Sequence, residues 1–269
     1  MNGRPYVYAR EGGERRGGAS SGVAGSGAYR RFTGCPVMAG FPSWLHLLAA
    51  ASIVVGIACA ITISLDEFRF RQKMGVMNAV WPLTALFGGL LWLWLYYRWG
   101  RNKGEQPDDT PMAIAVAKGA SHCGAGCALG DLIVEWAAFA LPGIAVAFGY
   151  PSLFGEETFA VWIPDFIVAF LIGIAFQYFA IAPMRHLSPG EGVLAAVKAD
   201  AASITSWQVG MYGMMAVGQF LWFRPAYGAL APVNSAEFWF LMQLAMLAGF
   251  CTAYPVNWWL ISAGLKEKM

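Results

Sequence analysis

The sequence predicts an all-α membrane protein with about six transmembrane helices. Hydrophobic residues make up 58% of the 269-residue chain and charged residues 13%, against about 45–50% and about 25% in soluble domains. A helix needs about 20 apolar residues to cross the hydrocarbon core of a bilayer, and six runs of that length follow one another along the chain. They cover residues 44–65, 76–97, 123–148, 159–183, 197–223 and 238–265.

The first 40 residues differ from the rest of the chain. They are rich in Gly, Ser and Arg and contain no apolar core, which predicts a disordered basic tail rather than a secretory signal peptide. A second interpretation is that translation begins at Met38 and that residues 1–37 are not translated. In either case residues 41–269 are expected to form the transmembrane domain.

The distribution of Lys and Arg favours one orientation in the inner membrane, because cytoplasmic segments carry an excess of these residues. With a cytoplasmic N-terminus, fourteen of the eighteen Lys and Arg residues lie on the cytoplasmic side. Without the tail, eight lie on the cytoplasmic side and four outside. The sequence therefore predicts that both termini are cytoplasmic. The four that this orientation places outside are Arg69, Arg71, Lys73 and Arg224.

A stripe of four residues at the start of the third run is the main functional signal. Cys123, Cys127, Asp131 and Glu135 follow one another at steps of four, and each lies about 40° further round a helix. The first three therefore share one face, and Glu135 lies at its edge. The two carboxyl groups would lie about 12 and about 18 Å along the helix from the first cysteine. A charge at that depth costs at least about 2.5–3.5 kcal/mol, so we expect a proton or cation relay.

The same stretch carries donors suited to a transition metal. His122 and the thiols of Cys123 and Cys127 are typical ligands of Cu(I) or Zn(II), and Asp131 follows one turn later. The pattern predicts a copper or zinc site near the cytoplasmic end of the helix. Two residues of the fifth run would add thioether ligands, Met211 and Met215.

Helix packing is the alternative interpretation of these residues. Gly126 and Gly130 form a surface of small residues on which another helix can lie closely. Cysteine is small enough for such a contact, and methionine commonly fills irregular apolar gaps. The sequence leaves both interpretations open.

Other polar residues at membrane depth extend the predicted relay. They are Asp165 in the fourth run, Asp200 at the inner end of the fifth, and Asn257 next to Pro255 in the sixth. Hydrogen bonding between helices is the alternative role for the amide.

A weak internal repeat of roughly 80 residues is also visible. Val80-Trp81-Pro82 resembles the segment 161–164, and Ala115-Val-Ala-Lys118 resembles the segment 195–198. If the repeat is real, two equivalent helices turn their polar faces toward each other. In this register the four residues of the stripe correspond to Ser203, Trp207, Met211 and Met215.

Motifs of soluble enzyme chemistry are missing. The sequence has no phosphate-binding loop, dinucleotide fingerprint, zinc-protease helix, nucleophile elbow or haem-attachment motif, so an enzyme is not favoured. Five cysteines, an odd number, do not suggest a disulfide framework. The net charge of +2 gives no reason to expect nucleic acid as a partner.

The segment from Ser121 to Asp131, Trp81-Pro82 and the C-terminal stretch from Pro255 to Met269 resemble a bacterial membrane family. The family is known as domain of unknown function 4396, and the resemblance extends from about residue 40 onward. It implies a helical membrane protein. Fusion of some members to copper-oxidase-type modules favours copper. It assigns no site residues.

Three hypotheses follow from these observations. The leading one is an inner-membrane protein that binds or transports a transition-metal ion, with copper favoured. The second is a non-catalytic subunit of a larger membrane complex, with membrane proteins as partners. The third is a membrane redox or haem enzyme.

Overall fold

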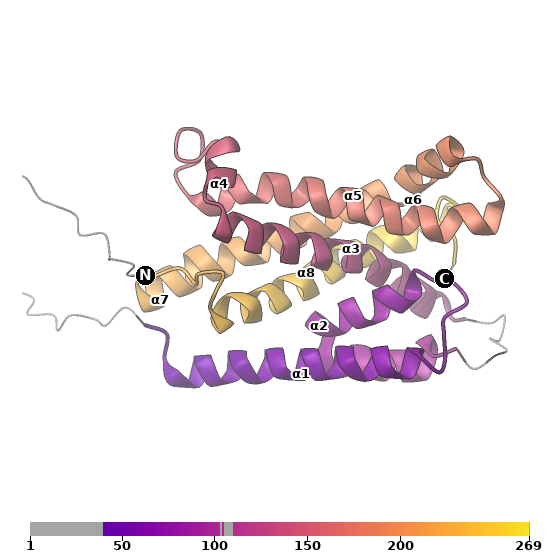
Figure 1. Ribbon diagram of the computed structural model, residues 1–269, viewed down its shortest axis with the longest axis horizontal. Coiled ribbons are helices and arrows are strands. Elements are labelled where there is room, and N and C mark those ends of the chain that lie inside the picture. The colour runs from indigo at the N-terminus through magenta and orange to yellow at the C-terminus, as the bar shows by residue number, and fades with distance from the viewer. Residues whose placement is uncertain (1–39, 103, 105–109, 269) are drawn as a thin grey trace, which may run out of the picture. The chain divides into compact units, whose positions relative to one another are not determined.

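The computed structural model describes residues 40–102, 104 and 110–268, and every regular element in these residues is a helix (Figure 1). The predicted tail lies outside the described residues, except for residue 40. The all-α prediction is confirmed for the part of the chain that the structure describes. The elements are α1 (Ser43–Glu67), α2 (Met77–Leu95), η1 (Tyr96–Gly100), α3 (Met112–Ala140), α4 (Gly143–Ala147), α5 (Glu157–Arg185), α6 (Pro189–Ala216), η2 (Val217–Phe223), α7 (Arg224–Tyr227) and α8 (Ala236–Ser262).

Five segments are long and apolar enough to span a membrane, namely α1, α2 with η1, α3, most of α5, and α8. This agrees with a multi-pass membrane protein. The helix α6 is 28 residues long but is not among the five. It carries Glu191, Lys198 and Asp200 in its first half and Gln208 in its second. The predicted count of six spans is therefore not confirmed.

The helix α2 folds back on itself instead of continuing in one direction. Gly89, at φ 51° and ψ −132°, breaks the helical path. The rings of Trp81 and Tyr96 then lie 5.7 Å apart, although 15 residues of continuous helix would separate them by about 22 Å. The predicted second span is thus a hairpin whose two ends lie at the same end of the helices (Figure 1).

Small residues and one amide stabilise this hairpin. A Cβ at Gly88 would collide with the ring of Trp92, so only glycine lets this ring pack across the bend. The Gln243 amide donates to the Leu86 carbonyl at 2.6 Å and accepts from the Ser52 hydroxyl at 2.6 Å. A backbone carbonyl at the bend is thereby satisfied inside the protein, as the hydrocarbon environment requires.

The helices α1 and α8 run parallel. His46 contacts Glu237 and Ser52 contacts Gln243, and both pairs are separated by 191 residues. The two helices therefore begin at the same end, and α1 begins at the end opposite to the one where α8 finishes (Figure 1). The prediction that the first span starts on the same side as the C-terminus is wrong, because α2 turns back where a full crossing was expected.

The loops at the two ends of the α2 hairpin lie together. Asp66 binds Arg101 through two hydrogen bonds of 2.8 Å, and the Asn102 amide donates to the Arg71 carbonyl at 2.6 Å. The prediction placed residues 69–73 outside and residues 98–101 inside. They share one end, and among the described residues Arg224 is the one Lys or Arg at the other end.

The helix α3 contacts α2, α5, α6 and α8. Its small residues lie against α5, since a Cβ at Gly126 would meet the backbone of Gly173 at 2.7 Å and one at Gly130 would meet Ala169 at 2.6 Å. The predicted packing role of these two glycines is confirmed. The close approach brings polar side chains of α3 and α5 within reach of each other.

Candidate functional site

Buried polar side chains gather along the contacts of α3, α5, α6 and α8. They form an inner cluster near the end of α8, a carboxyl pair near the middle of α3, and a cavity at the opposite end. Several polar residues in and between these three groups are at most 3% exposed. They include His122, Asp131, Asp165, Gln177, Asp200, Ser203, Gln208, Gln219, Asn257 and Lys266.

Lys266 is the centre of the inner cluster. Its ammonium donates to Asp200 Oδ1 at 2.6 Å and to Asn257 Oδ1 at 2.8 Å. The Gly119 carbonyl at 3.1 Å and Cys123 Sγ at 3.2 Å complete its surroundings. Both side chains of the Lys266–Asp200 ion pair are fully buried, so each charge depends on the other for its stabilisation.

A turn after α8 inserts this lysine between the helices. The chain reverses at Gly264, which has a φ of 70°, and the amides of Leu265 and Lys266 both donate to the Leu260 carbonyl. This is the usual way in which a glycine ends a helix. In the sequence Lys266 counted only as one of the basic residues that indicate orientation, although Gly264 two residues earlier was a signal for a turn of this kind.

The inner cluster unites four residues that were named in the predictions from sequence. Cys123 Sγ lies 2.7 Å from Asp200 Oδ1 and 2.9 Å from Ser203 Oγ, and the Asn257 amide donates to Ser203 at 2.6 Å. Burial by itself lowers the pKa of Lys266, but the Asp200 carboxylate outweighs it and raises this pKa above its usual range. The lysine is therefore a fixed cation at all physiological pH values.

The contact between Cys123 and Ser203 also joins the two positions that the repeat register paired. This one contact does not confirm the repeat. The segment around Trp81 belongs to a hairpin, whereas the matching segment around Trp162 lies in a long helix.

A pair of carboxyl groups lies deeper, between α3 and α5. Asp131 and Asp165 lie within hydrogen-bonding reach of each other, and Tyr212 Oη of α6 donates to Asp165 Oδ2 at 3.2 Å. Both aspartates are fully buried. The groups that act electrostatically on Asp131 are Asp165 and Glu135, which are themselves acids.

The surroundings of this pair disfavour two negative charges. Two carboxylates have no hydrogen between them, so a hydrogen bond between Asp131 and Asp165 requires one of the two to be protonated. No protein donor among the described residues reaches either oxygen of Asp131, and none of their ion pairs involves this pair. Two carboxyl groups this close to each other cannot both be ionised in apolar surroundings.

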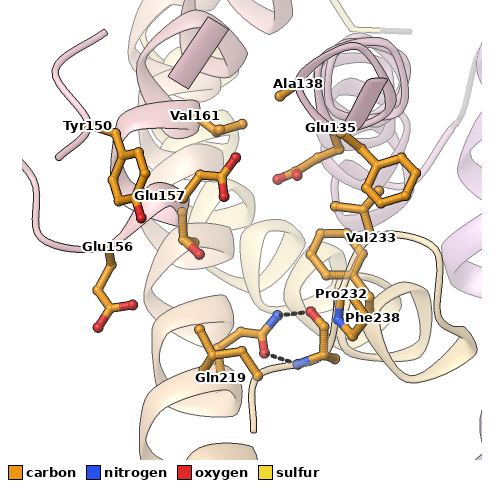
Figure 2. A pocket seen from close by; sticks show the side chains of 14 residues that line it. Glu135, Ala138, Tyr150, Glu156, Glu157, Val161, Gln219, Pro232, Val233 and Phe238 are labelled. Atoms are coloured by element: carbon orange, nitrogen blue, oxygen red, sulfur yellow. Dashed lines mark hydrogen bonds between the residues drawn. The ribbon is translucent and has the colours of Figure 1, made fainter. Parts of the chain in front are cut away.

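Glu135 leads from the carboxyl pair to a cavity of about 460 Å³ at the opposite end of the helices. Figure 2 shows the side chains of Glu135 and Glu157 pointing into this space from different helices. Glu157 is exposed and Glu135 is buried. On another wall Gln219 exchanges two hydrogen bonds with the Ala231 backbone, at 3.0 and 2.8 Å. The cavity therefore connects solvent to a buried carboxyl group.

Further polar groups lie between the inner cluster and the carboxyl pair. Along α6, Gln208 is between Asp200 and Tyr212, and along α3, Cys127 is between Cys123 and Asp131. The side-chain nitrogen and oxygen atoms of Gln208 have no hydrogen-bond partner in the described structure, and those of Gln177 and His122 have none either. These groups offer sites for a hydrogen-bonded proton or water chain.

The predicted metal ligands are not gathered at one point. The described residues contain no group of three or more His, Cys, Asp or Glu that could hold a metal ion. The His122 ring packs edge-on against Phe176 at 6.1 Å, and Cys123 contacts the Lys266 ammonium. Met211 and Met215 are buried in the same apolar core as Cys127. A copper or zinc site stays a prediction, with Cys127 and these thioethers as its remaining soft donors.

Comparison with known proteins gives one match. The family model described as Domain of unknown function (DUF4396) matches residues 114–266, which is more than half of the chain. The matched segment runs from the start of α3 to Lys266 and contains every residue of the inner cluster and the carboxyl pair. Neither the curated proteins nor the solved structures contain a match.

Proposed function

We propose that this chain, which belongs to the DUF4396 family, moves protons or small cations across a membrane along buried polar side chains of α3, α5 and α6. The observation that carries the proposal is the Asp131–Asp165 pair. Buried carboxyl groups that lack a cationic partner are costly in a membrane protein and normally mark an ion or proton pathway. A structural role would be served by apolar residues at lower cost.

The order of the polar groups supports a path. From the cavity, the path would run through Glu135 to the carboxyl pair, then past Cys127 and Gln208 to the inner cluster. The ammonium of Lys266 ends it, because a fixed positive charge repels a proton or cation that approaches Asp200. Passage would require Lys266 to separate from Asp200, so we assign this ion pair the role of an inner gate.

The arrangement of the helices also supports an orientation. The end where α8 finishes carries Arg69, Arg71 and Lys73 together with Arg98 and Arg101. By the positive-inside rule this end is cytoplasmic. The chain would then cross the inner membrane with α1, α3, α5, α6 and α8, while α2 enters and leaves on the cytoplasmic side. The cavity would face outward.

Proton movement in proteoliposomes tests the proposal. The full chain is reconstituted, a potassium diffusion potential is imposed, and internal pH is followed with a fluorescent dye. We expect proton flux above that of empty vesicles, and at least a tenfold loss in Asp131→Asn and Asp165→Asn. Glu191→Gln is the matched control, because Glu191 is an exposed acid that only caps the start of α6.

Two outcomes would contradict the proposal. Wild-type flux equal to that of empty vesicles, with proton, sodium and potassium readouts, would favour the alternative of a non-catalytic subunit. Flux that survives in the Asp131→Asn/Asp165→Asn double variant would remove the carboxyl pair from the path.

A transition-metal cargo is the narrower form of the proposal. Its support is the soft donor set of Cys123, Cys127, Met211 and Met215 on facing helices. Metal analysis of protein purified without chelators tests it. Near-stoichiometric copper or zinc that is lost in Cys123→Ala/Cys127→Ala would establish the metal. Metal-free protein that still conducts protons would reject the metal cargo and leave the proton path as the proposal.

A further inference from the structure

A second cavity, of about 400 Å³, opens on the side of the helices and is separate from the outer cavity. It lies among α1, the tip of the α2 hairpin, α3 and α8. Its rim includes Ile57, Leu132 and Trp136, which are 45%, 39% and 42% exposed. These residues lie in segments long and apolar enough to span a membrane, so the opening faces the hydrocarbon of the bilayer. Its volume is within the range of small-molecule sites, about 300–1,000 Å³.

Asp131 is the polar group at the inner end of this cavity. It is fully buried, and neither of its oxygens accepts a hydrogen bond from a protein donor of the described structure. The other polar lining residue, Gln243, is engaged with Ser52 and Leu86. A molecule that entered from the lipid would therefore meet one carboxyl group as its polar contact.

The walls are apolar and aromatic. Trp136 and Trp239 lie nearly parallel, with ring centroids 6.1 Å apart and planes at 14°, and Phe87 and Leu86 of the hairpin tip close the far side. Aromatic faces attract cations through their quadrupole, by about 0.5–1 kcal/mol when exposed and about 2 kcal/mol when desolvated. Such walls accommodate a bulky apolar molecule and favour a positively charged one.

The charge of the surroundings selects the sign of the ligand. The ionisable groups facing Asp131 are Asp165 of α5, Glu135 and Cys127 of α3, and Tyr212 of α6. All of these are neutral or negative in every protonation state. A cation that replaces the proton of the carboxyl pair is stabilised here, whereas an anion is repelled.

We propose that the lateral cavity binds a lipophilic organic cation, such as a hydrophobic amine or a quaternary cation with aromatic groups, and that Asp131 neutralises its charge. The inference rests on the proposed function and names a substrate class for it. The cation enters from the lipid, and the proton of the carboxyl pair leaves toward Glu135 and the outer cavity. Proton and organic cation would thus compete for one carboxyl group.

Binding of tetraphenylphosphonium to the purified full chain in detergent tests the proposal. Titration calorimetry, with empty micelles as reference, is paired with the fluorescence of the wall tryptophans. We expect saturable binding that becomes tighter as pH rises, because deprotonation frees the carboxylate. Asp131→Asn should weaken it at least tenfold, and Glu191→Gln, which alters only the exposed cap at the start of α6, should leave it unchanged.

A second variant covers the case in which Asp131→Asn fails to fold. Leu132→Trp adds bulk at the lipid-exposed rim of the cavity without altering the carboxyl group. It should fold normally and abolish binding. The neutral analogue triphenylphosphine oxide should bind at least tenfold more weakly than the phosphonium.

Equal binding of the neutral analogue, or phosphonium binding that is insensitive to pH and to Leu132→Trp, would overturn the proposal. Absence of phosphonium binding in a protein that conducts protons would also overturn it, while the proposed proton path would stand. Phosphonium binding in a protein that conducts no protons would support the lateral site and contradict the path.

Discussion

At the scale of single residues, the protein contains two different arrangements of buried ionisable groups. The inner cluster matches one ammonium to one carboxylate inside the protein, with Asn257 and a backbone carbonyl completing the contacts of Lys266. The carboxyl pair has no such partner among the described residues, and in the proposed function it keeps a proton instead. The first arrangement fixes a charge in place, whereas the second allows a charge to be exchanged.

Removing the lysine should therefore destabilise the protein strongly. Lys266→Met leaves Asp200 charged and unpaired, which typically costs about 3–5 kcal/mol, and we expect a clearly lower midpoint of thermal unfolding in detergent. Lys266→Met/Asp200→Asn should recover most of the loss, because no buried charge then remains. The exposed residue Lys268 provides the control, and Lys268→Met should be neutral. A stable Lys266→Met variant would show that the ion pair does not form.

Much of the site could be predicted residue by residue, but its pairings could not. Asp131, Asp165 and Asp200 stand out in the sequence because a carboxyl group within an apolar run is costly and normally has a functional role. Their partners depend on which helices touch. Asp131 and Asp165 come together because small residues of α3 let α5 approach, and Lys266 arrives through a turn beyond the last helix.

At the scale of elements, α2 is the segment where the sequence interpretation and the structure differ most. Hydropathy measures the length of an apolar run but not its path, and a hairpin of two half-length helices contains as many apolar residues as one crossing. The signal was the pair Gly88-Gly89 in the middle of the run. Glycine in the middle of an apolar run is equally consistent with close helix packing, so the sequence alone did not decide between a hairpin and a straight helix.

The bend at Gly89 makes a direct prediction. At φ 51° and ψ −132° a residue with a side chain occupies a sparsely populated backbone conformation, which costs about 1–3 kcal/mol, so Gly89→Ala should lower the midpoint of thermal unfolding. Gly75→Ala is the matched control, since a Cβ there meets open space and its φ is ordinary. If Gly89→Ala unfolds at the wild-type temperature, α2 does not turn at this residue.

At the scale of the whole transmembrane domain, the hairpin sets the topology. A segment that enters and leaves on one side adds no crossing, so it reverses the predicted side of everything before it. This explains why α1 and α8 run parallel. Among the described residues it also gathers the Lys and Arg residues at one end and leaves Arg224 at the other, a stronger asymmetry than the eight-to-four excess predicted for the chain without its tail.

Labelling of single cysteines from either side of the membrane tests this topology. In a background with Cys35 and Cys251 changed to Ser, Lys73→Cys, Arg98→Cys and Lys268→Cys should all react from the cytoplasmic side. Ser152→Cys should react from the outside. Each of these four positions is exposed. Reaction of Lys73→Cys and Arg98→Cys from opposite sides would restore the six-crossing arrangement.

The central claim is that Asp131 and Asp165 hold a proton that can leave. Infrared spectroscopy of the protein in lipid at neutral pH measures this through the carbonyl stretch of a protonated carboxyl group. We predict a band that shifts when water is replaced by heavy water and that disappears in Asp131→Asn/Asp165→Asn. The absence of such a band, or a band that does not respond to heavy water, would mean that the pair is ionised or sealed, and either result would contradict the account.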